Sequence, residues 1–307
     1  MDLRQLAALT AVADHRSFSA AARALHTVQS NVSAHIANLE RELGTPLVDR
    51  TSGQLTEAGE LVVVRARRVQ SELDALAADV ASSLGEISGV VRLGVIGTTG
   101  RWLVPMLLSE LAAAHPKVRL VVVDATTTSL LPQLAAGSLD VAVVNLPAVD
   151  PDVDTEVLFE EEHVLLLTDD HPLADRRSIH LRDLADLPLL LEPPGTGFRD
   201  DLDADAARAG VTLTAQAEVD GMRLLASLAY QGYGAAILPA SAVVEWSDGS
   251  WSTVALEGTT PRGVGLATPR RGRLAAPTRS TIEVLRRVIA TEVPSRPLLH
   301  LRDAERP

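Results

Sequence analysis

The sequence predicts a multi-domain protein of the α+β class, in which a helical N-terminal part precedes an α/β part. Two short helices with a sharp turn between them are expected in residues 17–43, and residues 60–84 contain neither proline nor glycine. From residue 88 onward, continuous apolar strands alternate with helical segments, which is typical of a parallel sheet covered on both faces.

A first helix is expected from Asp2 to Asp14, and the next two helices meet in a turn at His26–Thr27. Ser19 is predicted to cap the helix before this turn and Thr27 the helix after it, because each hydroxyl can accept a hydrogen bond from an amide at a helix start. The helix after the turn repeats apolar residues at spacings of four, three and four. This predicts one apolar stripe, formed by Val32, Ile36, Leu39 and Leu43.

The opposite face of this helix carries compact hydrogen-bonding groups instead of the Glu, Lys and Arg of an ordinary solvated face. They are Gln29, Ser30, Asn31, Ser33, His35 and Asn38. Amide and hydroxyl groups both donate and accept, so this face suits base edges in the major groove of DNA. The alternative is a helical hairpin whose polar face meets only solvent.

Further spaced residues follow, including Gly44, Arg50 and the run Leu55-Thr56-Glu57-Ala58-Gly59. The pattern A-A-x-x-L … Q-S-x-x-S-x-x-I-x-x-L-E-x-x-L-G-x-P-L-x-x-R … L-T-x-A-G resembles the N-terminal domain of LysR-type transcriptional regulators. The resemblance implies a winged helix-turn-helix in residues 1–59, with its wing near residues 51–54. The DNA-binding residues expected are Gln29, Ser30, Asn31, Ser33, His35, Arg23 and Arg50.

The charge of the chain argues against generic nucleic-acid binding, because its formal net charge is −12. Residues 1–58 hold five Arg, no Lys and six acids. Phosphate contacts normally supply much of the affinity for DNA, so the few cations must stand where the backbone passes. Arg4, Arg23, His35 and Arg50 are the candidates, and Arg50 is the expected anchor near the wing.

A long helix is predicted for residues 60–86, about 40 Å long at 1.5 Å per residue. Its apolar residues keep spacings of three and four for much of its length, which indicates a seam between two helices. They are Leu61, Val69, Leu73, Leu76, Val80, Leu84 and Ile87. The natural partner is the same helix of a second copy, which would place two DNA-reading helices on a pseudo-palindromic site. Packing against its own chain is the alternative.

The α/β part contains eight expected strands, at residues 90–96, 118–124, 139–145, 164–168, 187–191, 215–219, 235–238 and 264–268. It resembles the effector-binding domain of LysR-type regulators in stretches such as RLGVIGTTGRWLVPMLL, GSLDVAVVN and EPPGTGF. The resemblance implies a two-lobed, periplasmic-binding-protein-like α/β domain in residues 89–293, after a linker helix in residues 60–88. Lobe 1 would hold about 89–162 and 268–293, and lobe 2 about 163–267. Crossing strands are expected near 159–168 and 264–268, and residues 294–307 are expected to form a loosely ordered tail.

A small ligand is expected between the lobes, where strand-to-helix corners gather hydroxyls and free amides. The predicted effector-binding residues are Thr98, Thr99, Gly100, Arg101, Thr127, Thr128, Thr196, Gly197, Phe198 and Asp220. Arg101 or Arg199 could pair with a carboxylate, so an anionic effector is one option. Each Thr could instead be a simple helix cap.

No enzyme is predicted, because the usual catalytic motifs are missing from the sequence. The chain has no cysteine, and the spacing of its histidines matches no metal site, so we expect no cofactor and no metal. The polar cluster from Glu160 to His163 is interpreted as the exposed start of a hinge strand rather than a catalytic pair. We also expect no signal peptide and no membrane span, and therefore a cytoplasmic protein.

These observations predict a transcriptional regulator that binds double-stranded DNA as a homodimer or homotetramer. A small effector bound between the lobes would change how the DNA-reading helices are presented, and RNA polymerase is a further partner to consider. The alternative is a small-molecule binding protein or an enzyme on the same two-lobed scaffold, without DNA binding. The low basic charge of residues 1–58 favours that alternative.

Overall fold

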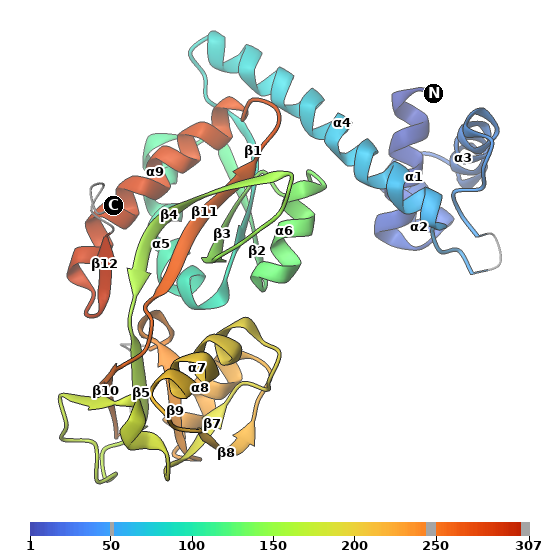
Figure 1. Cartoon of the computed structure of the whole chain (residues 1–307). Coiled ribbons are helices and arrows are strands. Elements are labelled where there is room, and N and C mark those ends of the chain that lie inside the picture. Colours follow the sequence, from blue (N-terminus) through green and yellow to red (C-terminus); the bar gives the residue numbers. More distant parts are fainter. Residues whose placement is uncertain (50–51, 244–249, 302–307) are drawn as a thin grey trace.

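The computed structural model describes residues 1–49, 52–243 and 250–301, which form a helical head, one long helix and two α/β lobes (Figure 1). The head contains α1 (Leu3–His15), α2 (Phe18–Ala24) and α3 (Gln29–Leu43), packed around a core of their own. After α3, Val48 and Leu55 form an antiparallel bridge where the sequence predicted a wing.

The predicted cap of α2 is wrong, because Ser17 and not Ser19 occupies the N-cap position. The backbone of Ser17 is extended, and its hydroxyl accepts a hydrogen bond from the amide of Ala20 at 3.3 Å. Ser19 lies inside the helix, where its hydroxyl donates to the side chain of Gln29 at 2.7 Å. This bond joins α2 to the first residue of α3.

The long helix α4 (Glu57–Ser83) connects the head to lobe 1 and is about 40 Å long. It begins three residues before the predicted start, because the hydroxyl of Thr56 accepts a hydrogen bond from the amide of Gly59 and caps it. Gly59 packs directly on the head: a Cβ atom at this position would lie 2.0 Å from the carbonyl oxygen of Leu47.

Lobe 1 contains a sheet whose described strands have the order β12-β4-β11-β3-β1-β2. The predicted parallel pairing is present between β1, β2 and β3, but the sheet is mixed, because β11 is antiparallel to both β3 and β4, and β12 is antiparallel to β4. The elements are β1 (Gly89–Val95), α5 (Gly97–Ala114), β2 (Val118–Asp124), α6 (Thr127–Ala135), β3 (Val141–Leu146), β4 (Val153–Glu161), β11 (Arg262–Pro269), α9 (Ala276–Glu292), η3 (Val293–Ser295) and β12 (Leu299–Leu301). The pairing of β12 with β4 contradicts the prediction of a loosely ordered tail, although residues 302–307 lie outside the described residues.

Lobe 2 contains a second sheet, with the described strands in the order β6-β10-β5-β9-β7-β8. β7 pairs in parallel with β8 and β9, and β10 pairs in parallel with β6, whereas β5 runs antiparallel to both β9 and β10. The elements are β5 (His163–Thr168), β6 (Ser178–His180), η1 (Leu181–Leu184), β7 (Pro188–Leu191), α7 (Gly197–Arg208), β8 (Thr214–Glu218), α8 (Met222–Tyr230), β9 (Ala235–Pro239), η2 (Ala240–Ala242) and β10 (Trp251–Glu257).

The chain crosses between the lobes twice. The first crossing is at Glu162, between β4 and β5, within the predicted stretch 159–168. The second is at residues 258–261, between β10 and β11. The predicted crossing strand near 264–268 lies within β11, which begins directly after this crossing and pairs with β3 and β4 in the sheet of lobe 1. The antiparallel strands β4 and β11 thus lead side by side from lobe 1 to lobe 2 (Figure 1).

Candidate nucleic-acid interface and inter-lobe cleft

The polar face of α3 is open to solvent at the start of the helix. Gln29, Ser30 and Asn31 are exposed, and Ser33 and His35 are half-buried. The described residues of this face make few side-chain hydrogen bonds: Gln29 accepts from Ser19, Asn31 donates to Thr27, and Asn38 accepts from Arg41 at 2.8 Å. The surface that the sequence singled out is therefore accessible.

The opposite face of α3 packs into the head. Val32, Ile36 and Leu39 are buried, as the apolar stripe predicted. Leu43, the fourth predicted member of the stripe, is 42% exposed and lies outside the core. Burial of one face fixes which side of α3 is presented to a partner.

The turn between α2 and α3 lies where the sequence predicted it, with His26 at a φ of 50°. Thr27, however, does not cap α3: the N-cap residue is Val28, which has no side chain able to do so. The hydroxyl of Thr27 instead accepts a hydrogen bond from the side-chain amide of Asn31 at 3.0 Å. The first amides of α3 thus have no side-chain cap, and such amides attract an anion.

Few cations surround this face. Arg23 is exposed in the last turn of α2, and Arg4 is exposed near the start of α1. Arg50, the predicted anchor near the wing, lies outside the described residues. The acid Glu40 has a structural role, since its side chain accepts hydrogen bonds from the amides of Leu47 and Val48.

One stripe of α4 is uncovered, and we call it the α4 stripe. Its members are Val69, Leu73, Leu76, Val80 and Leu84, all exposed. Another side of the helix is held against lobe 1, where Arg68 pairs with Asp152 at 2.9 Å and Asp79 accepts the amide of Ala276. The helix therefore packs on its own chain with one side and still leaves an apolar stripe without a cover in the protomer.

A buried ion pair joins the two crossing strands at the base of the inter-lobe cleft. Arg262 of β11 donates to Glu161 of β4 at 2.9 Å, and Glu161 has no exposed surface. Arg262 also donates to the hydroxyl of Thr98 in lobe 1 at 2.9 Å. Glu161 accepts the amide of Ser241 at 2.8 Å. These bonds connect α5, η2 and both crossing strands.

On lobe 1, the predicted effector residues lie at the starts of α5 and α6, but several are less open than expected. Thr98 and Thr99 are buried, and the hydroxyl of Thr99 has no hydrogen-bond partner. Arg101 donates to the carbonyl of Ala242 at 3.3 Å. Thr127 accepts the amide of Asn145 at 2.9 Å.

The remaining predicted lobe 1 residues are Gly100, next to the side chain of Val95, and Thr128, whose hydroxyl bonds that of Thr126 at 3.0 Å. Neither α5 nor α6 has a side-chain cap at its N-terminus. Lobe 1 thus presents two helix starts with free amides to the cleft.

On lobe 2, the hydroxyl of Thr196 accepts a hydrogen bond from the amide of Arg199 and caps α7. Thr196 therefore has the alternative role given for each Thr, that of a helix cap. Gly197 begins this helix, and a Cβ atom there would meet nothing within 4 Å. Phe198 packs against His163 with ring centroids 5.3 Å apart. Asp220 is exposed just before α8, and its side chain forms no hydrogen bond or ion pair among the described residues.

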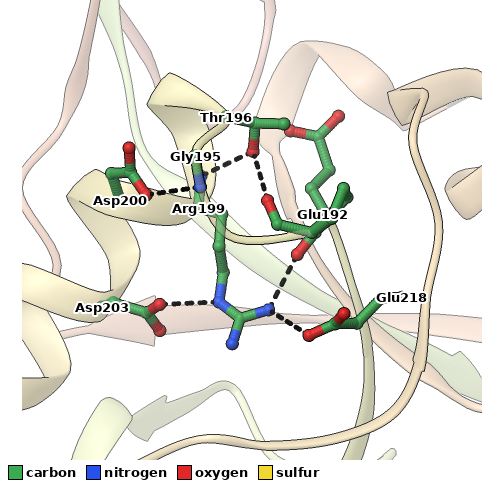
Figure 2. Close-up of polar contacts among 8 residues, drawn as sticks. Glu192, Gly195, Thr196, Arg199, Asp200, Asp203 and Glu218 are labelled. Carbon is green, nitrogen blue, oxygen red and sulfur yellow. Dashed lines mark hydrogen bonds and ion pairs between the residues drawn. The ribbon is translucent and has the colours of Figure 1, made fainter.

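Figure 2 shows that Arg199 is held by a carbonyl oxygen and by two carboxylates. Its guanidinium donates to Asp203 at 2.8 Å and to the backbone carbonyl of Glu192 at 2.7 Å, and it pairs with Glu218 at 3.5 Å. The side chain is 9% exposed. Arg199 is therefore a structural cation that holds the start of α7 in place, and it is not free to pair with an effector carboxylate.

Glu161, His163 and Arg262 were not among the predicted site residues. The cluster at Glu160–His163 was predicted to be exposed, whereas Glu161 and His163 are buried. Burial, and after it the charge of Arg262, lower the pKa of His163 to about 4. Arg262, which organises this hinge, follows a turn and carries no local signal in the sequence.

No helix of the described residues is long and apolar enough to cross a membrane. In the same part of the chain, no group of three or more His, Asp or Glu side chains is arranged to hold a metal ion.

Comparison with protein families gave two matches. Residues 3–60 match the bacterial regulatory helix-turn-helix protein, lysR family, and residues 84–290 match the LysR substrate binding domain. The chain is 35% identical over 246 residues to the DNA-binding transcriptional dual regulator OxyR of Escherichia coli, covering 79% of this chain and 80% of the relative. It is 38% identical over 246 residues to a probable hydrogen peroxide-inducible genes activator of Mycobacterium avium, covering 78% of each.

Solved structures are similar over the whole chain. A full-length cysteine-to-aspartate variant of OxyR from Pseudomonas aeruginosa superimposes with a TM-score of 0.76, at 26% identity, covering 100% of this chain and 99% of that one. CbnR in complex with its target DNA superimposes with a TM-score of 0.69, at 23% identity, covering 94% and 100%. The second likeness shows the fold alone.

Proposed function

Because the chain belongs to the lysR family of bacterial regulatory helix-turn-helix proteins, it is a DNA-binding transcriptional regulator with an effector-binding domain, and we propose how its residues divide this work. The alternative of a binding protein or enzyme without DNA binding is not supported by the family. We propose that the protein works in the cytoplasm, where its DNA target would be.

The DNA-reading surface is the start of α3. The observation that carries this proposal is that its polar face is exposed while its apolar face is buried in the head. Gln29, Ser30, Asn31 and Ser33 contact base edges, and His35 lies near a base or a phosphate. Arg23 and Arg50 contact phosphates, aided by the uncapped amides of α3.

Self-association occurs through the α4 stripe. An apolar stripe on an exposed helix of about 40 Å is stabilised when a second copy covers it. A second exposed apolar set, Met106 and Leu108 on α5 and Val122 on β2, would serve a dimer of dimers. Pairing of two heads then allows contact with two half-sites of one duplex, and RNA polymerase would be recruited by the assembled complex.

The effector binds reversibly between the lobes. Some relatives are named as activators of hydrogen peroxide-inducible genes, and the solved OxyR structure above carries a substitution at a cysteine. This chain contains no cysteine, so no thiol can be oxidised and no disulfide can form. We propose that its response depends on a non-covalent ligand that changes the relation of the two lobes.

A gel-shift titration tests the DNA-binding part of this proposal. The full-length protein is titrated onto a fragment of its own upstream region and onto a shuffled fragment of the same length. We expect a specific, salt-sensitive band, weakened in Ser33→Ala and Arg50→Ala and unchanged in Ser227→Ala, an exposed serine of lobe 2. Equal binding to both fragments, with all variants like the wild type, would contradict it.

A further inference from the structure

The two edges of the inter-lobe cleft differ in electrostatic character, and this difference indicates what kind of effector the chain takes. The argument rests on the proposed function, since it concerns the same cleft. Four arginines lie around the cleft, and three of them pair with carboxylates: Arg199 with Asp203 and Glu218, Arg262 with Glu161, and Arg223 with Asp124. The cleft is therefore not the generally cationic site that an anionic effector would favour.

The pair between Arg223 and Asp124 also shows that the two edges face one another. Arg223 is in the first turn of α8 in lobe 2, and Asp124 ends β2 in lobe 1. Their side chains are 2.9 Å apart. A ligand bound behind this pair would touch both lobes.

The lobe 1 edge favours negative charge. The amides that begin α5 and α6 have no side-chain cap, and the two helices are 18 and 9 residues long. Arg101 is the one arginine of the four with no carboxylate partner among the described residues; it donates to the carbonyl of Ala242. The carboxylate of Asp124 lies beside Gly97 at the start of α5, and its charge is offset by Arg223. An anionic group placed at this edge would meet Arg101 and two helix dipoles.

The lobe 2 edge favours positive charge. The start of α7 is closed, because Thr196 caps it and Asp200 accepts the amide of Gly195 at 2.9 Å. Two carboxylates remain near it, Glu192 after β7 and Asp220 before α8, and neither forms an ion pair within the described residues. Burial raises the pKa of Glu192, and the charge of Asp220 raises it further, against a hydrogen bond from Thr196. Both carboxylates would be stabilised by a cation between them.

Buried polar atoms without a partner provide independent evidence for a ligand. Thr99 Oγ1 at the start of α5, Asn145 Oδ1 at the end of β3 and His163 Nδ1 at the start of β5 have no hydrogen-bond partner. Thr99 has no exposed surface and His163 is 6% exposed. Such atoms are costly unless something bonds them, and these three belong to elements of both lobes, α5 and β3 in lobe 1 and β5 in lobe 2.

We propose that the effector is a small zwitterion of the amino-acid type, with its carboxylate at the lobe 1 edge and its ammonium group between Glu192 and Asp220. Thr99 and Arg101 recognise the carboxylate end together with the amides of α5 and α6. Glu192 and Asp220 determine specificity, because a ligand without the ammonium group leaves them as two neighbouring acids without a counter-charge.

Isothermal titration calorimetry of the full-length protein at pH 7.5 tests this proposal. The probes are the common L-amino acids, β-alanine and 4-aminobutyrate, each compared with the same carbon skeleton lacking the amino group and with the same skeleton lacking the carboxylate. We expect at least one zwitterion to bind, with both matched analogues weaker by about tenfold or more. Glu192→Gln and Asp220→Asn should weaken zwitterion binding by a similar factor and leave the carboxylate-only analogue unchanged. Asp170→Asn, an exposed acid after β5, is the matched control.

Three outcomes would overturn the proposal: a carboxylate-only analogue that binds as tightly as its zwitterion, Glu192→Gln and Asp220→Asn that bind like the wild type, or no binding by any zwitterion of the set. Melting temperatures confirm that each variant is folded. The gel shift separates this result from the proposed function, since it needs no effector. A specific DNA band together with a purely anionic ligand refutes only the zwitterion, whereas loss of that band refutes the regulator.

Discussion

Arg262 and Glu161 form a buried ion pair between the two strands that connect the lobes, with Glu161 wholly inaccessible to solvent. The pair also bonds Thr98 of lobe 1 and Ser241 of lobe 2, so an element of each lobe and both crossing strands meet at one cluster of charge. A movement of one lobe relative to the other must therefore preserve these bonds or break them.

Removing one partner of this pair should be costly. Arg262→Met leaves Glu161 as an uncompensated buried charge, and we expect a loss of about 3–5 kcal/mol in the free energy of unfolding. The double variant Glu161→Gln, Arg262→Met removes both charges and should lose less. The control Arg286→Met breaks an exposed pair with Glu156 and should cost about 1 kcal/mol or less. Urea unfolding measures these free energies. The expectation is contradicted if Arg262→Met is as stable as the double variant, or more stable.

The neutral state of His163 makes stability depend on pH. Its pKa is lowered from 6.5 to about 4 in the folded protein, so the unfolded chain binds the proton more readily. Stability from this residue is therefore complete above pH 6.5 and is lost as the pH falls from 6.5 towards 4. The difference of about 2.5 pKa units corresponds to about 3 kcal/mol.

Replacing the imidazole isolates this contribution, because acids such as Asp140 and Glu192, whose pKa values are raised by burial, act in the opposite direction at low pH. His163→Phe keeps a ring beside Phe198 and cannot take a proton. Urea unfolding at pH 7.5 and pH 5 should show a smaller loss of stability in this variant than in the wild type. Equal losses would show that His163 is not the group that titrates.

Close packing at Gly59 should be intolerant of a single methyl group. A Cβ there would lie 2.0 Å from the carbonyl oxygen of Leu47, which is backbone and cannot turn aside. We expect Gly59→Ala to destabilise the head by about 1–3 kcal/mol and to weaken specific DNA binding. Glu60→Ala changes an exposed neighbour on the same helix and should be neutral. Thermal unfolding and a gel shift measure the two effects. A Gly59→Ala variant as stable and as active in DNA binding as the wild type would show that α4 does not pack on Leu47 in this way.

Charge on the α4 stripe should prevent self-association. Leu76 and Val80 are 64% and 56% exposed in the protomer, so replacing both with Glu costs the monomer little. A partner covering them would bury two carboxylates, and the dissociation constant should rise by tenfold or more. Sedimentation equilibrium measures this. Tyr233→Glu, at a position 61% exposed in lobe 2, should associate like the wild type, and a Leu76, Val80 variant that still dimerises would refute the role of the stripe.

Local patterns in the sequence predicted the helices and strands better than the way in which the strands pair. The apolar spacing in α3 predicted that Val32, Ile36 and Leu39 are buried, because helical periodicity is a property of the segment itself. The family pattern included Gly59, although only the packed structure explains it through Leu47. The antiparallel pairing of β11 was missed because apolar strands look alike whether they pair in parallel or antiparallel.

Side-chain partners were harder to predict than elements. Ser19 and Ser17 are both plausible caps by composition, and only the backbone conformation of Ser17 decides between them. At the cleft, Arg199 stood beside a predicted corner and was a candidate for an anion, yet its partners come from 4 to 19 residues away. Arg262 lies 101 residues from Glu161, so no local pattern could reveal their pairing.

Base reading and phosphate binding by the head should separate in their response to salt. Asn31→Ala removes an uncharged group from the start of α3, so specific affinity should fall by about 1–3 kcal/mol while the slope of log K against log salt stays unchanged. Arg23→Ala removes an exposed cation, so it should weaken specific and shuffled DNA alike and reduce the slope by about 1. Fluorescence anisotropy over a range of salt concentrations measures both quantities. Because the head holds few cations, the loss of one is a large share of the total, and an unchanged slope in Arg23→Ala would place the phosphates elsewhere on the molecule.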